Sequence, residues 1–374
     1  MKQSERRRRA PAWGLLSLFA WACTGEPVGE LVTDAGSGGQ GGDAAADADA
    51  GAGAGPEWLA VGLDCPSDLR VSGGTLSFVE QGSLQASGKD GRVRTLPASG
   101  CPDGGSACAL TLADGQGSPA AIEIDSATGD VYWATVLDGT IWKLPANGLV
   151  PEVFAGGQGT PRSLAIDDTA LYWVNAGAQG AADGEVRRRY LEGGTVGGIA
   201  IATGLESPVA MARIDSNLFF SVSGGTATTG SVETCDITGS GRHVLAQNQS
   251  RPRGVAANAT HVYWANSEDG SLWRVARSGT PAELLVSGRA TPADVAVDAD
   301  SLYWVEAGTP SEYSDGALVR SDLEGHDATV LAKGLRDPRR LALDSEYVYF
   351  VSRGTQGVKV CTQHDGSVAR VPKK

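Results

Sequence analysis

The side chains best suited to acid-base chemistry in this chain are its four histidines, His243, His261, His326 and His364. Each lies in a different repeat of the sequence, beside an expected strand start or hairpin. None belongs to an HExxH motif or to a clustered Cys/His pattern of the kind that holds zinc. A glycine-rich phosphate loop and a GxSxG nucleophile motif are also missing. The sequence therefore predicts no catalytic residue and no metal ligand.

Arginines gather beside a set of regularly spaced prolines. Six lie within two residues of such a proline, and they are Arg162, Arg251, Arg253, Arg336, Arg339 and Arg340. Guanidinium groups brought together bind carboxylate or phosphate through paired hydrogen bonds. We therefore name Arg162, Arg253 and Arg339 as candidate binding residues. The alternative is that each arginine pairs with an acidic residue of the adjoining repeat.

A long loop after Trp304 supplies a second set of candidates. Glu312, Tyr313 and Asp315 add one aromatic ring and two negative charges there. Loops carried by a rigid scaffold often hold the contact residues of a binding site. We expect these three side chains to contact a ligand.

A third set of polar residues is formed by Asp125, Asp167, Asp298 and Asp344. Carboxylates that recur in this way are possible metal ligands. Each follows an apolar strand, however, and an aspartate at a strand end usually accepts hydrogen bonds from the backbone of the turn. We expect these residues to cap turns.

The elements that position these residues follow from an internal repeat. A proline opens each unit, 40 to 53 residues after the previous one, at Pro66, Pro119, Pro161, Pro208, Pro252, Pro292 and Pro338. An aromatic residue follows 12 positions later, or 14 in one unit, at Phe78, Trp133, Trp173, Phe220, Trp264, Trp304 and Phe350. A glycine then precedes an alternating strand, at Gly82, Gly139, Gly184, Gly230, Gly270, Gly316 and Gly357. Three markers thus agree on seven units.

Each unit divides into four short strands. In the unit of Pro292 these are residues 295–298, 302–306, 317–322 and 329–332, with turn residues between them. Four-stranded antiparallel units that pack radially bury their faces against their neighbours. The predicted fold is therefore all-β, a seven-bladed β-propeller, with Tyr-Trp pairs such as Tyr303-Trp304 packed between blades. The loops before the inner strands and those between second and third strands should share the rim at the channel mouth.

The ends of the repeat region indicate how the ring closes. Residues 59–63 and the following Pro66 repeat residues 331–335 and Pro338 at identical spacing, so residues 58–62 resemble an outer fourth strand. We expect this N-terminal strand to complete the last blade beside residues 358–362. Residues 367–371 compete for the same place.

The N-terminus is predicted to be a secretory signal followed by a tether. Residues 1–22 run from four arginines into an apolar stretch, the layout of a secretory signal, and Cys23 ends a lipobox-like segment. We expect Cys23 to be lipidated; the alternative is an ordinary signal peptide. Residues 23–56 are rich in Gly, Ala and Asp and form a disordered tether, which leaves residues 57–374 for the propeller. Thr24, which follows the cysteine, favours the outer membrane as the location of the lipoprotein.

Five cysteines remain after Cys23, and an oxidising compartment favours their pairing. Cys101 and Cys108 flank a natural turn and are the expected pair. If residues 58–62 close the ring, Cys65 and Cys361 come close enough for a second bridge, and Cys235 stays free.

Several units resemble known propeller families. Val131-Tyr132-Trp133 followed by residues 139–143 is similar to the YWTD repeats of lipoprotein-receptor propellers. Strands such as residues 164–167 and 295–298 look like those of NHL and virginiamycin B lyase-type propellers. These families include both binding modules and enzymes, so the resemblance implies the fold and leaves the activity open.

The net charge of the chain indicates which classes of partner it can bind. The net charge is −13, and removing the basic signal makes the chain more acidic still, which disfavours nucleic acid. We expect a lipid-anchored envelope protein that acts as a non-catalytic binding or scaffold propeller, with ligand or protein contacts on the channel-mouth rim and the lipid as its membrane contact. The alternative is a lyase or hydrolase acting at the channel mouth. No cofactor is predicted, and that alternative leaves room for a divalent metal.

Overall fold

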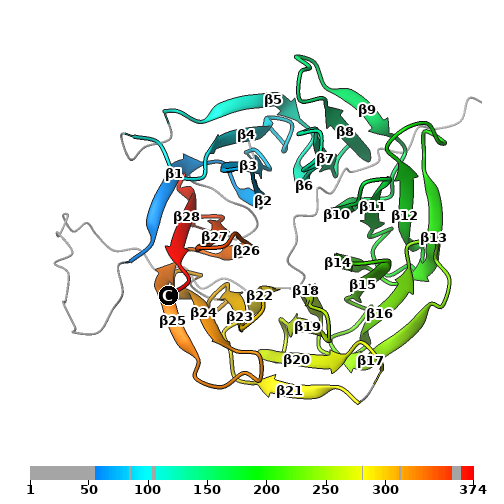
Figure 1. Ribbon diagram of the computed structural model, residues 1–374, viewed down its shortest axis with the longest axis vertical. Helices are drawn as coiled ribbons and strands as arrows, with labels where there is room; N and C mark the ends of the chain where they lie inside the picture. The colour runs from blue at the N-terminus through cyan, green and yellow to red at the C-terminus, as the bar shows by residue number, and fades with distance from the viewer. Residues whose placement is uncertain (1–54, 84–85, 103–106, 280, 311–312, 356–363) are drawn as a thin grey trace, which may run out of the picture. The chain divides into compact units, whose positions relative to one another are not determined.

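The computed structural model describes residues 55–83, 86–102, 107–279, 281–310, 313–355 and 364–374. They form seven four-stranded antiparallel sheets arranged as the blades of a ring around a channel (Figure 1). The seven-bladed propeller predicted from the sequence is therefore confirmed. Among these residues, no helix has the length and apolarity needed to cross a membrane.

Within each blade the first strand is innermost and the fourth is outermost (Figure 1). Blades one to three comprise β2 (Pro66–Ser72), β3 (Thr75–Glu80), β4 (Gly91–Pro97), β5 (Leu110–Gln116); β6 (Pro119–Ile124), β7 (Val131–Thr135), β8 (Thr140–Leu144), β9 (Glu152–Ala155); β10 (Pro161–Ile166), β11 (Ala170–Asn175), β12 (Gly184–Tyr190), β13 (Ile199–Leu205). Blades four to six comprise β14 (Pro208–Ile214), β15 (Asn217–Val222), β16 (Gly230–Asp236), β17 (His243–Gln249); β18 (Pro252–Ala257), β19 (His261–Asn266), β20 (Ser271–Ala276), β21 (Glu283–Val286); β22 (Pro292–Val297), β23 (Ser301–Glu306), β24 (Gly316–Asp322), β25 (Thr329–Leu335). Blade seven comprises β26 (Pro338–Leu343), β27 (Tyr347–Ser352), β28 (Gly366–Pro372) and β1 (Glu57–Leu63).

Blade seven takes strands from both ends of the described chain. β1 pairs antiparallel with β28, with Trp58 opposite Ala369 and Val61 opposite Ser367. Residues 58–62 are thus an outer fourth strand, as expected. The predicted neighbour was wrong, because residues 367–371 are the third strand and do not compete for the fourth place, whereas residues 358–362 lie outside the described residues.

Buried aromatic residues on the second strands hold neighbouring blades together. Trp133, Trp173, Trp264 and Trp304 have no accessible surface. One core cluster joins Tyr132 of blade two to Trp173 of blade three. Burial of such a side chain contributes roughly 1.5–3 kcal/mol or more. The predicted inter-blade packing of the Tyr-Trp pairs is confirmed.

Glycine begins the third strand where the next blade comes closest. A Cβ on Gly184 would lie 2.5 Å from Cδ of Pro208, the proline that opens the following blade. Gly91 meets Pro119 in the same way, and Gly366 meets Pro66. The prediction of Gly82 and Gly357 as these markers was therefore wrong. Gly82 precedes Asp90-Gly91 in the loop between β3 and β4, and Gly357 lies outside the described residues.

The residue before each opening proline has a left-handed backbone. These residues have φ between 52° and 62°, and they are Cys65, Ser118, Thr160, Ser207, Arg251, Thr291 and Asp337. Their carbonyls accept hydrogen bonds from the residue that follows the second strand, as Thr160 accepts from Ala176 at 3.0 Å. Non-glycine residues rarely adopt this conformation, so these bonds compensate for local strain.

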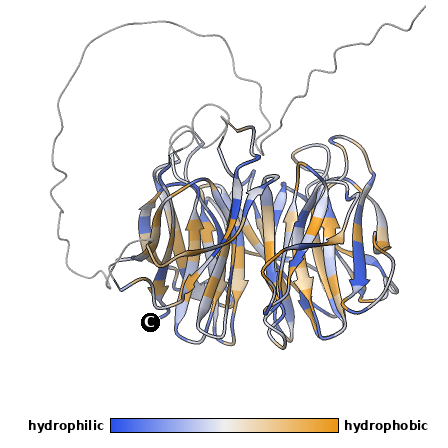
Figure 2. Cartoon of the chain, turned by 90° about the horizontal axis from the view of Figure 1, so that it is seen from above, coloured by the Kyte–Doolittle hydropathy of each residue, from blue (hydrophilic) through white to orange (hydrophobic). Residues whose placement is uncertain are grey.

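These bonds place the loops before the inner strands beside the loops between second and third strands, as predicted. We call this end of the ring the mouth rim. The opposite rim holds the turns between first and second strands and the hairpins between third and fourth strands. Figure 2 shows the ring edge-on, with the strands running between its two rims.

The cysteines agree with part of the prediction. Cys101 and Cys108 form a disulfide with a Cα–Cα distance of 5.5 Å, in the segment between β4 and β5. Cys235 is a buried free thiol. Cys65 is buried and disulfide-bonded. Cys361, like Cys23, lies outside the described residues, so the Cys65–Cys361 bridge stays a prediction.

Candidate functional site

Three predicted arginines occupy equivalent positions at the mouth rim. Arg162, Arg253 and Arg339 each follow the first residue of an inner strand, in blades three, five and seven. Their side chains are half-buried. Because the inner strands surround the channel (Figure 1), the fold distributes these three residues around its mouth.

Two of these arginines, Arg339 and Arg253, have neighbours in their own blade or in an adjoining loop. Arg339 Nε lies 2.6 Å from a carboxylate oxygen of Asp337, and its guanidinium stands 5.8 Å from the Tyr313 ring centre. Asp337 is fully buried, so its charge depends on such an ion pair. Arg253 Nε donates to Ser267 Oγ at 3.1 Å.

The other predicted arginines pair with carboxylates in two ways. Arg251 lies 3.5 Å from Glu268, and Arg336 lies 2.8 Å from Asp365, each within one blade or its leading loop. Arg340 crosses to the neighbouring blade, where its Nη1 lies 3.2 Å from Asp294. Pairing across blades therefore holds for Arg340 and does not hold for the first two.

The mouth rim also contains an arginine that the sequence prediction missed. Arg353 follows β27, and its backbone N–H donates to the Asp337 carbonyl at 3.1 Å. Its Nη2 donates to Gln81 of the first blade at 2.5 Å. Arg353 lies 15 residues after the nearest opening proline, so spacing from the proline could not reveal it.

Of the loop residues predicted as contacts, Tyr313 belongs to the rim beneath Arg339. It packs half-buried on the core between blades six and seven. Asp315 accepts hydrogen bonds from Thr309 N at 2.8 Å and from Thr309 Oγ at 3.1 Å, and these bonds lower the pKa of its carboxyl. Its carboxylate is thus engaged in holding the loop. Glu312 lies outside the described residues.

The recurring aspartates at the opposite rim cap turns, as predicted. Asp167 accepts from the backbone N–H of Thr169 at 2.8 Å and Ala170 at 2.9 Å, and from Tyr172 Oη at 2.8 Å. Asp298 and Asp344 make the equivalent bonds. No group of three or more His, Cys, Asp or Glu side chains suited to a metal occurs among the described residues.

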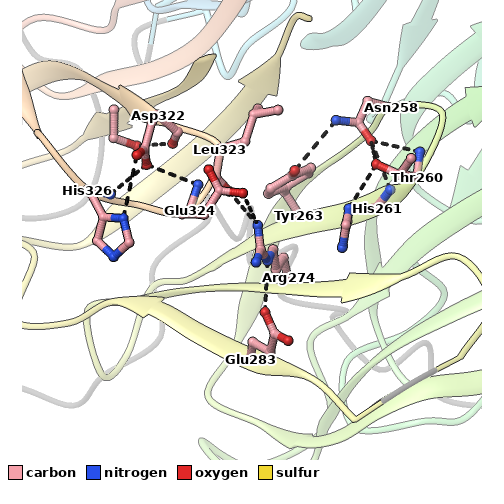
Figure 3. Close-up of polar contacts among 11 residues, drawn as sticks. Asn258, Thr260, His261, Tyr263, Arg274, Glu283, Asp322, Leu323, Glu324 and His326 are labelled. Atoms are coloured by element: carbon pink, nitrogen blue, oxygen red, sulfur yellow. Dashed lines mark hydrogen bonds and ion pairs between the residues drawn. The ribbon is translucent and has the colours of Figure 1, made fainter. Parts of the chain in front are cut away.

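Figure 3 shows the opposite rim where blades five and six meet. Arg274 of β20 donates Nε to Glu283 at 2.9 Å and Nη1 to both Glu324 and the Leu323 carbonyl at 3.0 Å. Burial and the charge of Arg274 lower the pKa of nearby His261. Arg274 therefore joins two blades.

The channel contains a charged cluster that the sequence prediction missed. Arg70 lies 3.1 Å from Asp68 through Nη1 and 3.0 Å from Glu123 through Nε. Burial opposes the charge of Arg70, but these carboxylates raise its pKa above the usual value. Burial raises the pKa of Asp294 even though Arg340 lies beside it. The Arg70–Asp68 and Arg340–Asp294 ion pairs line a chamber of about 290 Å³.

Apolar residues make up much of the remaining channel wall, together with Ser163 and Arg213. Met211, Val255, Val295 and Leu343 line both this chamber and a second one of about 390 Å³. The inner-strand position of Arg70 is taken by alanine in five other blades, namely Ala165, Ala212, Ala256, Ala296 and Ala342. Apart from Arg213 of blade four, the charged residues that line the two chambers therefore lie on the arc formed by blades six, seven, one and two.

One histidine–carboxylate pair occurs on the described part of the mouth rim. His364 Nδ1 contacts Asp64, which also lies 3.2 Å from Arg92 Nη1. His364 precedes β28 and Asp64 follows β1, so the pair stands over the two outer strands of blade seven, away from the channel. His243, His261 and His326 lie at the opposite rim.

Comparison with known sequences finds no matching family model and no matching curated protein. Solved structures with a similar fold include a catalytically inactive virginiamycin B lyase from Staphylococcus aureus with quinupristin, which has 13% identity, a TM-score of 0.58, and coverage of 82% of this chain and 94% of the lyase. A PQQ-bound aldose sugar dehydrogenase from Streptomyces coelicolor has 15% identity, a TM-score of 0.50, and coverage of 70% and 96%. The calcium-binding protein regucalcin from Agrobacterium tumefaciens has 15% identity, a TM-score of 0.50, and coverage of 69% and 91%. These neighbours include enzymes and a binding protein, so the likeness is one of fold.

Proposed function

We propose that this chain is a non-catalytic binding propeller that a lipid on Cys23 holds at the cell envelope, with the outer membrane as its location. Its mouth rim contacts a partner that carries anionic groups. The observation that carries this proposal is the equivalent placement of Arg162, Arg253 and Arg339 around the channel mouth. Arg353 adds a fourth guanidinium to the same rim.

Electrostatics supports an anionic partner despite the acidic chain. The net charge of −13 repels anions at long range, so a local group of guanidiniums provides selectivity for one face. Guanidinium groups bind carboxylate and phosphate through directed, paired hydrogen bonds. A partner with several such groups would engage more than one blade at once.

Binding is favoured over catalysis by the positions of the histidines. A propeller lyase that uses a histidine–carboxylate pair needs that pair directed at the channel. Among the described residues, the mouth-rim pair of His364 and Asp64 stands over outer strands instead.

The rim is tested with citrate as a small carboxylate probe, titrated calorimetrically into the full chain. The triple substitution Arg162→Gln, Arg253→Gln and Arg339→Gln should weaken citrate binding at least about tenfold, because each lost guanidinium removes a charge-assisted pair. The matched control replaces Arg189, Arg242 and Arg277 at the opposite rim with glutamine and should retain binding. Equal weakening by both triple variants would contradict the rim assignment.

The anchor is tested by labelling cells that express the chain with a palmitate analogue. The wild-type chain should take up label and sediment with membranes, whereas a Cys23→Ser variant should do neither. A labelled Cys23→Ser variant would exclude this site of lipidation.

A further inference from the structure

The channel chamber between Asp68, Arg70, Asp294 and Arg340 has the properties of a built site for a small molecule. Its volume of about 290 Å³ is at the lower end of the range for ligand pockets. Both ion pairs are fixed from neighbouring blades, since Asp68 accepts from Ile122 N at 3.0 Å and Asp294 accepts from Leu341 N at 3.2 Å. A ligand would therefore meet charges whose positions are set by the ring.

The two guanidiniums that line the chamber retain unused hydrogen-bond donors. Arg340 uses Nη1 for Asp294, and no described residue accepts a hydrogen bond from its Nε or Nη2. Arg70 uses Nε and Nη1, and no described residue accepts from its Nη2. The Nε/Nη2 edge of an arginine is the fork that holds a carboxylate with two parallel bonds. These donors thus select a carboxylate.

The carboxylates of the same chamber select a cationic group. Each oxygen of Asp294 accepts one hydrogen bond in the structure, which leaves it a further lone pair. A ligand with only a negative charge would leave the remaining lone pairs of Asp294 unused. A ligand with only a positive charge would leave the guanidinium donors unused. A molecule with both charges satisfies both sets of groups.

The uncharged residues of the chamber wall indicate the chemistry of the uncharged part of the ligand. Met211 of blade four and Val255 of blade five offer an apolar surface outside the charged arc, and Val295 adds an apolar side chain next to Asp294. An aliphatic group against this wall would leave water and contribute binding free energy in proportion to its buried area.

We propose that this chamber binds a small zwitterion of the α-amino-acid type. Its carboxylate lies on the free edge of Arg340 and on Arg70 Nη2, its ammonium group lies on the Asp294 carboxylate, and its aliphatic side chain packs on the apolar wall. The chamber lies within the channel, so this inference goes beyond the contacts proposed for the mouth rim and does not depend on them.

The probe is L-leucine, titrated calorimetrically into the full chain at millimolar concentration. Two analogues each lack one charge: 4-methylpentanoate has no ammonium group, and 3-methylbutylamine has no carboxylate. Leucine should bind at least about tenfold more tightly than either analogue, because each analogue leaves one set of buried groups unpaired. No detectable heat with leucine, or equal affinity for all three compounds, would overturn the proposal.

Two variants locate the binding in the chamber. Arg340→Lys keeps the charge beside Asp294 but removes the fork, and should weaken leucine binding at least about tenfold. Ala342→Leu fills the chamber without changing its charge and should abolish binding. The matched control is Arg213→Lys in the second chamber, which should bind leucine normally. Unchanged affinity in both Arg340→Lys and Ala342→Leu, with melting temperatures near that of the wild type, would exclude this chamber.

The proposals for the mouth rim and for the chamber can be refuted independently of each other. The triple glutamine variant of the mouth rim should lose citrate and keep leucine, whereas Arg340→Lys should lose leucine and keep citrate. Loss of both ligands in either variant would contradict the independence of the two sites.

Discussion

The two rims of the ring use arginine differently. At the opposite rim, arginines at equivalent positions of the third strands donate to the carbonyl just after the third strand of the next blade. Four blade junctions show this bond, from Arg188 to Ile237, Arg274 to Leu323, Arg320 to Lys373 and Arg370 to Ala98, at 2.8 to 3.0 Å for three of them and 3.1 Å for Arg320. At the mouth rim, Arg251, Arg336 and Arg339 pair within their own blade or its leading loop.

Arginines bonded across blades at the opposite rim have a structural role, whereas those paired locally at the mouth rim can take part in recognition. A guanidinium bonded across a junction cannot leave its carbonyl without exposing an unsatisfied group. A mouth-rim guanidinium paired locally can exchange partners without separating two blades. At the opposite rim arginine therefore joins blades at four junctions, whereas at the mouth rim local pairing has an exception in Arg353, which donates to Gln81 of the first blade.

Among the substitutions that test this difference between the rims, Arg370→Ala should have the largest effect on stability. Arg370 donates to the Ala98 carbonyl across the junction of blades seven and one, and its guanidinium lies 4.1 Å from the Tyr347 ring centre. Its ion pair with Glu57 is half exposed and adds little. Loss of the bond and of the packing should reduce the free energy of unfolding by about 2–3 kcal/mol. The urea midpoint measures this, and an effect no larger than that of Arg253→Ala would refute the distinction.

A smaller effect is expected from Asp167→Asn at the same rim. Burial tends to raise the pKa of Asp167, but hydrogen bonds from Thr169, Tyr172 and Ala170 outweigh it and lower this pKa below 3.8. Because the folded pKa is depressed, the stabilisation is present above the unfolded pKa and is lost as the pH falls through the folded value. The substitution should cost about 1–2 kcal/mol at neutral pH.

That cost should diminish in acid, where the wild-type carboxyl also takes up a proton. Unfolding midpoints of both proteins, measured from neutral pH to below pH 3.8, provide the test. A cost that stays constant over this range would show that the charge of Asp167 does not matter for its caps.

The smallest effect is expected at the mouth rim, from Arg253→Ala. Its Nε donates to the Ser267 hydroxyl in the same blade. The free energy of unfolding should change by no more than about 0.5 kcal/mol. Thermal unfolding measures this, and a loss as large as that of Arg370→Ala would show that both rims hold the ring.

The blade count could be predicted from sequence because the residues that mark the repeat make contacts that recur from blade to blade. Five of the opening prolines, all except Pro161 and Pro292, meet a glycine of the preceding blade, and each aromatic residue of the second strand fills the space between two sheets. The markers failed in the first and last blades. There the loop between second and third strands is long and contains its own glycines, such as Gly82 and Gly354, both with positive φ.

The sequence by itself determined the propeller, the turn-capping aspartates, the Cys101–Cys108 pair and the arginines beside the prolines, because each depends on residues close together in the chain. Only the tertiary structure brought Asp68, Arg70 and Glu123 together with Asp294 and Arg340 in the channel. These residues come from four blades and more than 200 residues of sequence, at positions where other blades carry alanine, glycine or serine. No local pattern marks them, because their contact exists only once the ring places the last blades beside the first.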